Sequence, residues 1–309
     1  MPPQPGDDEK VGESDVTWGE LFGRSKGGGM KTWIVIDGDN LCHRAFYALG
    51  PAGMSHEGAA TGVLYGFLSD ILYFEEFYRT PHILFAFDHG KGLRYQMCPG
   101  YKSKRKSKDR PPEEVEGLHE MRRQMKLLKF QYLHEAGFRN VHFQTGYEAD
   151  DVIASLVKHS IPKDDEIRIV SSDRDLYQLL SPRCSIWSPS LKKETSYHSF
   201  KAEHAIEPKA WKWVKAIAGC TSDDIPGIKG IGEKSAVKYM RGDESMPQRY
   251  YDLIAKGMEF AKANLKLVKL PLEGCHQFPI EPDEVTGTKW RELCSMLGLK
   301  SLQRRLPRM

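Results

Sequence analysis

The stretch TGYEADDVIASLVKH, residues 145–159, places three carboxylates within one turn of a predicted helix start. Carboxylates at such short spacing repel one another, and a fold keeps them together when a cation lies among them. A simpler interpretation is also open, because Thr145 followed by Glu148 fits a capping box and acids in a first turn favour the positive end of the helix dipole. The triplet alone therefore allows either a divalent metal site or a helix cap, formed by Glu148, Asp150 and Asp151.

Other acids follow apolar runs that have the composition of buried strands. A helix-period apolar stripe over 61–78 separates the first two runs, and strands that alternate with helices predict a parallel sheet. The short apolar run at 141–143 would bring the helix start at 145 to the same edge. The three long runs are KTWIVID (31–37), PHILFAFD (81–88) and EIRIVSSDRD (166–175), which end at Asp37, at Asp88 and at Asp173 and Asp175.

Ligands of a parallel sheet bind beyond the carboxyl ends of its strands, so all of these acids are expected at one edge. A single acid after a strand is common, because Asp suits turns and helix caps. About seven carboxylates converging on one crevice would instead repel one another strongly without counter-ions. The coincidence of three such strands with the triplet therefore favours a metal site over separate helix caps.

The composition is that of an ordinary globular enzyme, and 309 residues suffice for one large domain or two joined ones. No apolar run approaches the roughly 18 to 20 residues of a membrane span, and no secretory signal is recognisable, so we expect a cytoplasmic protein. Six cysteines are scattered without a CxxC pair, which signals neither a zinc site nor a disulfide framework. Residues 1–29 are rich in Gly, Pro and acids and predict a flexible extension.

Two further segments point to a phosphate-bearing partner. The first, HGKGLRYQMCPGYKSKRKSKDRP (89–111), is dense in Lys and Arg and follows an acid-bearing strand. A solvated basic loop is the simpler interpretation, but cations beside clustered acids suit a nucleic acid, with Tyr95 and Tyr101 available to stack on bases. The second, GCTSDDIPGIKGIGEKSAVKYM (219–240), has glycines between a helix predicted over 208–218 and one from Glu233. Backbone N–H groups exposed there fit a DNA phosphate, and the residues concerned are Gly227, Gly230, Gly232 and Lys234.

With these residues in view, the chain resembles the 5′-nuclease family, which includes bacteriophage flap endonucleases and the 5′–3′ exonuclease domain of bacterial DNA polymerase I. The resemblance runs from about Lys31 to Met240 and depends on six motifs in family order: VIDGDN, FAFD, YKSKRKSKDRPP, YEADD, SSDRDLYQLL and SDDIPGIKGIGEKSA. It implies an α/β fold with a central, mainly parallel sheet flanked by helices, known as a PIN-like core.

The resemblance further implies a division of the chain into three parts. The expected parts are the extension over 1–29, a nuclease core over 30–205 with a basic helical arch at about 89–118, and a helical DNA-binding subdomain over 206–309 with a helix-hairpin-helix at about 219–242. We expect the tail over 245–309 to be helical and to pack against the DNA-binding side.

Individual roles also follow from the resemblance. Lys102 and Arg105 correspond to arch residues that contact the scissile phosphate, and Tyr101 and Lys104 are expected to contact DNA. Two metal ions, Mg²⁺ or Mn²⁺, are implied, with K⁺ at the helix-hairpin-helix. A first metal position would be held by Asp37, Asp88, Glu148 and Asp150, and a second would involve or share Asp151, Asp173, Asp175 and Asp223.

The implied activity is two-metal-ion hydrolysis of DNA near junctions between single strand and duplex, in replication or primer removal. The expected partner is DNA with a 5′ flap or free 5′ end and adjoining duplex. We expect a monomer in the cytoplasm of a bacterial or phage-infected cell, without membrane attachment.

One motif departs from the family pattern. The family reads Gly-Asp before the second Asp of its last acidic motif, whereas this chain has Gly219-Cys220, followed by Asp223 and Asp224. Cysteine is a poor ligand for Mg²⁺, which prefers oxygen, so Asp224 is a candidate compensating ligand. Two alternatives stay open: a structure-specific DNA-binding protein with weakened or lost cleavage, and a related metal-dependent ribonuclease.

Overall fold

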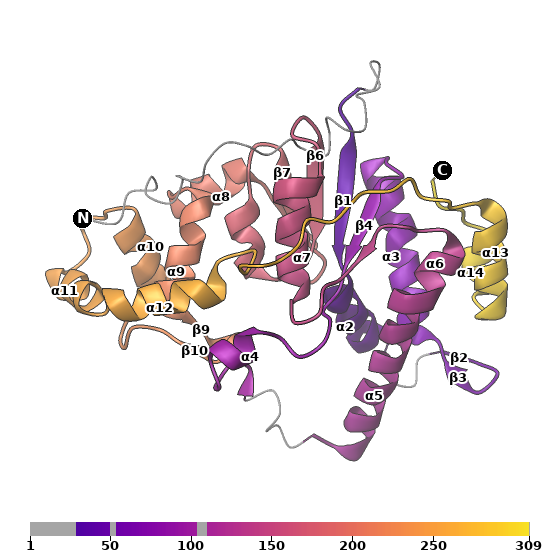
Figure 1. Ribbon diagram of the computed structural model, residues 1–309, viewed down its shortest axis with the longest axis horizontal. Coiled ribbons are helices and arrows are strands. Elements are labelled where there is room, and N and C mark those ends of the chain that lie inside the picture. Colours follow the sequence, from indigo (N-terminus) through magenta and orange to yellow (C-terminus); the bar gives the residue numbers. More distant parts are fainter. Residues whose placement is uncertain (1–28, 50–53, 104–109, 309) are drawn as a thin grey trace.

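The computed structural model describes residues 29–49, 54–103 and 110–308. At its centre lies a six-stranded sheet with the order β5-β4-β1-β6-β7-β8 (Figure 1). Neighbouring strands run parallel except at the edge, where β8 is antiparallel to β7. The prediction of a mainly parallel sheet is therefore confirmed. The strands are β1 (Thr32–Asp37), β4 (Ile83–Ala86), β5 (Val141–His142), β6 (Glu166–Val170), β7 (Cys184–Ser188) and β8 (Lys193–Thr195).

The register of the strands brings the acid-bearing loops to one edge of the sheet. Asp37 is the last residue of β1 and pairs with Ala86 of β4, while Ile36 pairs with Val170 of β6. The loops that leave β4 and β6 therefore begin level with Asp37, and they carry Asp88 and Asp173.

Both faces of the sheet are covered by helices, and β1 shows why. Successive side chains of a strand point to opposite faces, so Trp33 and Val35 enter one core and Ile34 and Ile36 enter the other. The first core is completed by α7 (Ala149–Ser155), α8 (Tyr197–His204), α9 (Trp211–Ala218), α10 (Glu233–Met240), α11 (Gln248–Lys256) and α12 (Met258–Val268). The second is completed by α2 (Gly38–Leu49), α3 (Gly62–Tyr78), α5 (Pro112–Leu127), α6 (Leu133–Ala136), α13 (Gly287–Met296) and α14 (Lys300–Gln303).

Short elements connect these layers. A π-helical turn, η2 (Leu128–Tyr132), joins α5 to α6, and a second, η3 (Leu156–Ser160), ends α7. The hairpin between α9 and α10 contains β9 (Gly219–Cys220), the 3-10 turn η6 (Thr221–Asp223) and β10 (Ile225–Pro226). The others are β2 (Ser55–His56), β3 (Ala59–Ala60), α4 (Arg94–Met97), η4 (Arg174–Leu179) and η5 (Pro208–Ala210).

The end of the chain packs against an earlier part of the fold. After α12, residues 269–286 run without helix or strand across the front of α7 towards α13 (Figure 1). There α13 contacts α6, and Trp290 and Leu293 enter the core formed with α2 and α3. The helices α13 and α14 thus pack with elements of the 30–205 segment rather than with the other helices of 206–309, while the expected packing against a DNA-binding side stays a prediction. The apolar pattern of α13 could not reveal which distant surface it covers.

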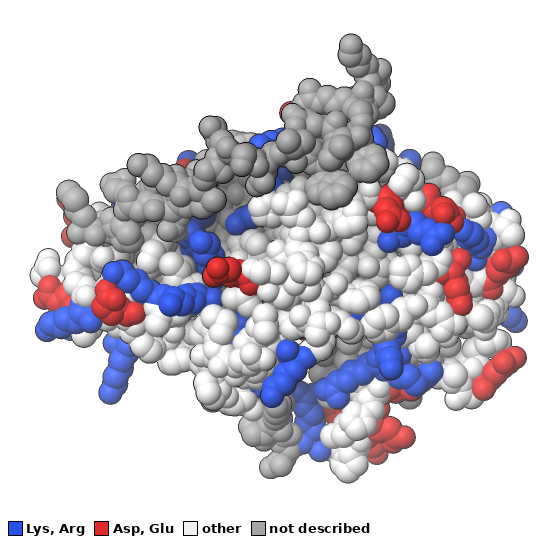
Figure 2. All heavy atoms as spheres, viewed as in Figure 1, with Lys and Arg blue, Asp and Glu red and all other residues white. Residues whose placement is uncertain are grey.

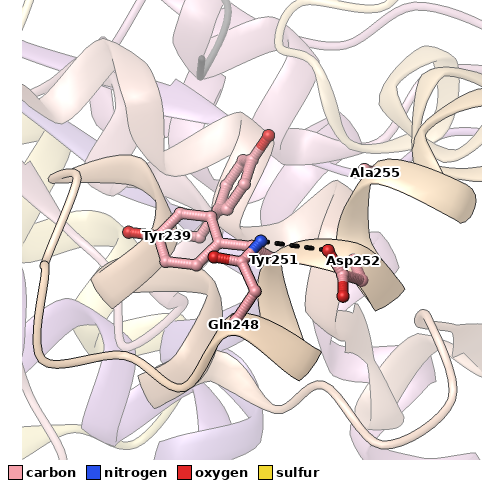
Figure 3. A pocket seen from close by; sticks show the side chains of 5 residues that line it. All are labelled: Tyr239, Gln248, Tyr251, Asp252 and Ala255. Carbon is pink, nitrogen blue, oxygen red and sulfur yellow. Dashed lines mark hydrogen bonds between the residues drawn. The ribbon is translucent and has the colours of Figure 1, made fainter.

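A pocket of about 310 Å³ lies between α10 and α11, remote from the acid-bearing edge (Figure 3). The Tyr239 and Tyr251 rings stand 5.5 Å apart there, and Gln248 Nε2 donates a hydrogen bond of 3.0 Å to Asp252 Oδ1. No helix in the described part of the chain has the length and apolar character required to cross a membrane.

Candidate functional site

The acids predicted to converge do meet at the carboxyl edge of the sheet. Ser171, just beyond β6, connects two of them: its Oγ donates to Asp37 Oδ2 at 2.7 Å and accepts from the Asp173 N–H at 3.1 Å. Burial, together with the charges of Asp88 and Asp173, raises the pKa of Asp37 to about 7. The first and third acid-bearing strands thus share one site.

The start of α7 adds further carboxylates to this site. The Ala149 N–H donates to Asp88 Oδ1 at 2.7 Å, which fastens the helix start to the loop after β4. Burial, followed by the charges of Asp173 and Asp37, raises the pKa of Asp150 well above its usual value. The pKa of Asp173 rises to about 6, because of burial and the neighbouring Asp175.

Three of these acids lack a basic partner. Among the described residues, no Lys or Arg forms an ion pair with Asp37, Asp150 or Asp173. Burial is the main reason that their pKa values are raised, and the charges of neighbouring acids raise them further. Together with Asp88 they form a set of oxygen ligands, and this is the donor set that Mg²⁺ and Mn²⁺ prefer. In donor chemistry, these residues therefore suit a divalent cation.

Asp39 belongs to the same group and was not singled out from the sequence. Its Oδ2 accepts a 2.7 Å hydrogen bond from the Asp88 N–H, and burial with the charge of Asp88 raises its pKa well above the usual range. The signal was available in the DGDN turn, whose second Asp lies two residues after Asp37.

The other carboxylates of the edge are balanced by basic side chains of the protein itself. Glu148 accepts a hydrogen bond from Lys102 Nζ at 2.6 Å and another from the Tyr101 hydroxyl at 2.8 Å. Arg94 Nη1 lies 3.4 Å from its Oε2. Burial opposes ionisation of Glu148, but Lys102 and Arg94 outweigh it and hold the pKa of Glu148 below its usual value. Lys102 Nζ also lies 3.8 Å from Asp223 Oδ1. Lys102 is thus held between two acids of the site.

Asp151 has a structural role that does not match its assignment as a metal ligand. It is fully buried, and Arg94 donates to both of its oxygens, at 2.6 and 2.8 Å. The Leu272 N–H donates to Oδ1 at 2.7 Å and the Glu148 N–H to Oδ2 at 3.2 Å, which caps α7. The helix therefore begins at Ala149, with Glu148 rather than Thr145 as its N-cap residue. Arg94, buried in α4 far along the chain, gave no signal in the sequence.

The tyrosines of the basic segment are not placed for stacking on bases as predicted. Tyr101 is only 2% exposed, and Tyr95 packs edge-on against it with ring centroids 5.4 Å apart. Tyr101 instead orients Glu148. The predicted contacts of Lys104 and Arg105 lie outside the described residues. Figure 2 shows basic side chains gathered on one face over α5 and beside α4.

Lys129 is a second basic residue that the sequence did not single out. It lies in the π-turn η2, and its Nζ donates to the Asp88 carbonyl at 2.7 Å and lies 3.0 Å from His89 Nδ1. The ammonium group stands 4.2 Å from the Phe143 ring centroid, and burial lowers the pKa of Lys129 to about 8. It ties the helix that follows the basic segment to the loop that carries Asp88.

A second group of ligand atoms lies beside the first. Asp175, Cys220 and Asp223 each offer one atom, and these atoms all lie within 4.8 Å of one another. Lys215 Nζ lies 2.8 Å from Asp175 Oδ1. Asp224, proposed as a compensating ligand, is not in this group; it ends η6 in the left-handed conformation, with φ of 55°.

The glycines of the α9–α10 hairpin serve different purposes. A Cβ on Gly227 would lie 2.0 Å from the Ala218 carbonyl oxygen, so this glycine is required for close packing rather than for exposing an N–H group. Gly230 has φ of +83°, and Gly232 caps α10 with open space around it. Gly230, Gly232 and Lys234 are exposed, as a contact with a phosphate requires.

A mainly parallel sheet flanked by helices, with carboxylates crowded beyond its carboxyl edge, defines the class of α/β proteins with a PIN-like core. The chain belongs to the family described as 5′–3′ exonuclease, N-terminal resolvase-like domain, whose model matches residues 32–209. The resemblance inferred from the sequence is therefore confirmed.

Relatives and solved structures agree with this membership. The chain is 30% identical over 267 residues to thermostable DNA polymerase I of Thermus thermophilus, a match that covers 82% of this chain and 30% of the polymerase. It is 34% identical over 212 residues to DNA polymerase I of Deinococcus radiodurans, covering 68% of this chain and 21% of that protein. The chain thus spans less than a third of these relatives.

Among solved structures, T5 5′-exonuclease with bound zinc is 25% identical, with a TM-score of 0.64 over 78% of this chain and 90% of that one. The Rad2 catalytic core in complex with DNA shares the fold at 14% identity, with a TM-score of 0.54 over 89% of this chain and 91% of that one.

Proposed function

We propose that this protein is a structure-specific 5′ nuclease that hydrolyses DNA phosphodiester bonds near junctions between single strand and duplex. The observation that carries the proposal is the convergence of Asp37, Asp150 and Asp173, which have no basic partner among the described residues. Family membership and the T5 5′-exonuclease, whose structure contains divalent metal, support it.

The proposed ligands of a first divalent ion, Mg²⁺ or Mn²⁺, are four acids that form no ion pair at 4 Å or less with a described Lys or Arg: Asp37, Asp88, Asp150 and Asp173. Asp175 and Asp223 would hold a second one, whereas Asp151 would remain the partner of Arg94. Metal ions bound at these positions would activate a water molecule and neutralise charge on the phosphate.

Lys102 is the proposed catalytic residue of the chain itself. Its pKa is raised: burial opposes the charge, but Glu148 and Asp223 more than compensate for it, so the ammonium stays charged. An ammonium held in this position would stabilise the negative charge that develops on a phosphate in the transition state. Arg105 is proposed to assist it.

The DNA duplex would be bound by the α9–α10 hairpin, which we propose as a helix-hairpin-helix. The exposed Gly232 at the N-terminus of α10 and the neighbouring Lys234 would contact a backbone phosphate, with K⁺ as a possible additional ligand of the hairpin. The basic segment after β4 would contact the single strand.

Asp150→Asn tests the proposal directly. We expect cleavage of a labelled 5′-flap DNA to fall by at least about 100-fold, since an essential ligand is lost, while binding of the same DNA in Ca²⁺ is retained. Glu292→Gln, which neutralises an exposed acid on α13, serves as the control and should cleave normally. Full activity of Asp150→Asn would refute the ligand assignment.

The alternative of a DNA-binding protein without cleavage is less favoured, because Asp37 and Asp173 bond to the same serine and Asp88 bonds to the start of the helix that carries Asp150, which supports a first metal position at these acids. Binding of the flap without product at any concentration of Mg²⁺ or Mn²⁺ would restore it. Matched RNA and DNA flaps distinguish a deoxyribonuclease from a ribonuclease.

A further inference from the structure

The second ligand group contains a sulfur atom at a position suited to metal coordination. Cys220 Sγ lies 3.7 Å from Asp223 Oδ2, and both belong to the set that spans at most 4.8 Å with Asp175. Bonds of about 2.0 to 2.3 Å to a tetrahedral ion place neighbouring ligand atoms about 3.5 Å apart. The three side chains can therefore reach one ion with small adjustments.

The hairpin fixes this arrangement. Cys220 pairs with Ile225 across β9 and β10, and the turn η6 between these strands brings Asp223 back towards the sulfur. All three ligand residues are largely buried, with Cys220 6% and Asp175 and Asp223 each 8% exposed. Ser222 Oγ lies 3.0 Å from the sulfur, within hydrogen-bonding distance.

The two carboxylates are already balanced by ammonium groups. Lys215 lies 2.8 Å from Asp175, and Lys102 lies 3.8 Å from Asp223. Mg²⁺ attracts carboxylates mainly through charge and would compete with these lysines, and it gains little from sulfur. A softer ion such as Zn²⁺, Co²⁺ or Cd²⁺ forms a strong bond to thiolate in addition.

We propose that Asp175, Cys220 and Asp223 form a mixed sulfur–oxygen site that selects a thiophilic divalent ion, of the Zn²⁺ type, over Mg²⁺. The inference rests on the proposed function, because this group is its second metal position. On binding, the S–H bond of Cys220 breaks, a metal–sulfur bond forms, and the proton passes to solvent without any change of oxidation state.

The test is a titration of the full chain with Co²⁺ in the absence of DNA. We expect a near-ultraviolet charge-transfer absorption from thiolate to Co²⁺ in the wild type. Cys220→Ser should lose the band and bind Co²⁺ about tenfold or more weakly. The matched control, Cys294→Ala, removes another buried thiol, in α13, and should keep the band. Cys220→Asp should lose the band and reach half-maximal cleavage at a lower Mg²⁺ concentration than the wild type.

A band that is absent from the wild type, or that persists in Cys220→Ser, overturns the proposal. If Cys220→Ser does not fold, the wild type alone decides through the ultraviolet absorption of a Cd²⁺–thiolate bond, whose absence overturns it equally. Cleavage of flap DNA is measured in parallel. Cleavage with Mg²⁺ and no thiolate band refutes the inference but not the nuclease function, whereas a band without cleavage by any metal refutes the nuclease function alone.

Discussion

Glu75 and the acids of the sheet edge show two ways in which single carboxyl groups are buried. At the sheet edge several acids share one site, and a bound cation can balance them. Glu75 of α3 is 2% exposed, and its Oε2 accepts a 3.0 Å hydrogen bond from the Arg308 N–H. Burial raises its pKa from 4.5 to about 8.

Glu75 should make the protein less stable as pH rises. Between pH 4.5 and about 8 the folded state holds a proton that the unfolded state has released, so stability falls across this window. The Gln side chain in Glu75→Gln stays neutral, so this variant should be more stable than the wild type near pH 9. Tm should rise by about 2 to 4 °C for each kcal/mol gained in the free energy of unfolding, and it should change little near pH 5. Thermal unfolding at both pH values measures this. Glu76→Gln is the control, since the Glu76 side chain is 78% exposed; an equal gain in both variants would contradict the assignment.

Lys102 is expected to act in turnover rather than in affinity. Its backbone has φ of 49°. Its ammonium group is paired with Glu148 and Asp223 and is therefore held at these acids rather than extended into solvent. Lys102→Ala should lower the single-turnover cleavage rate by about 100-fold, within the range for loss of one electrostatic stabiliser, and change the Kd for DNA much less. Exposed Lys91→Ala provides the comparison. A loss confined to Kd would make Lys102 a simple backbone contact.

At the scale of elements, the α9–α10 hairpin depends on glycines in unequal ways. A Cβ at Gly227 meets the Ala218 carbonyl oxygen at 2.0 Å, while one at Gly232 meets nothing within 4 Å. Gly227→Ala should lower the free energy of unfolding by about 1 to 3 kcal/mol through overpacking. Gly232→Ala should leave it within about 0.5 kcal/mol. Urea unfolding distinguishes the two, and similar values for both would show that the hairpin can shift to accept a side chain.

Element positions followed from the sequence wherever the signal was local. The apolar period predicted α3, the apolar runs predicted β1, β4 and β6, and Glu233 was predicted as the start of α10. The pairings of Arg94 with Asp151 and of Lys102 with Glu148 join residues about fifty positions apart, and a basic residue in a basic segment carries no mark of its partner. The sequence therefore predicted that the acids lie at one edge. Only the three-dimensional structure shows which of them pair with a basic side chain and which do not.

At the scale of the whole molecule, the two ends of the described chain meet on one core. Trp290 of α13 is fully buried in the core that α2 and α3 also line, and its Nε1 donates to the Leu302 carbonyl at 3.0 Å. The C-terminal helices therefore stabilise the sheet that carries the acids, although they lie on the side of the core away from α10.

Trp290→Ala should lower the free energy of unfolding by about 3 to 5 kcal/mol, the usual cost of emptying a buried aromatic site. DNA affinity of the folded protein should not change. Chemical unfolding and DNA-binding titrations on the same sample measure both quantities. Met296→Ala on the same helix is the control, because Met296 is 50% exposed. A Trp290→Ala protein of normal stability but weak DNA binding would place this helix on the DNA side after all.

The connection over 269–286 has no regular secondary structure, but several of its backbone amides donate hydrogen bonds to the rest of the protein. The amides of Leu272, His276 and Glu281 donate to side chains of Asp151, Gln144 and Asn140. Amides held in this way exchange with deuterated solvent only when the structure opens. These three amides of an irregular segment should therefore exchange hydrogen slowly, and the amide of Leu272 should exchange only when it separates from Asp151 on the helix that carries the acids.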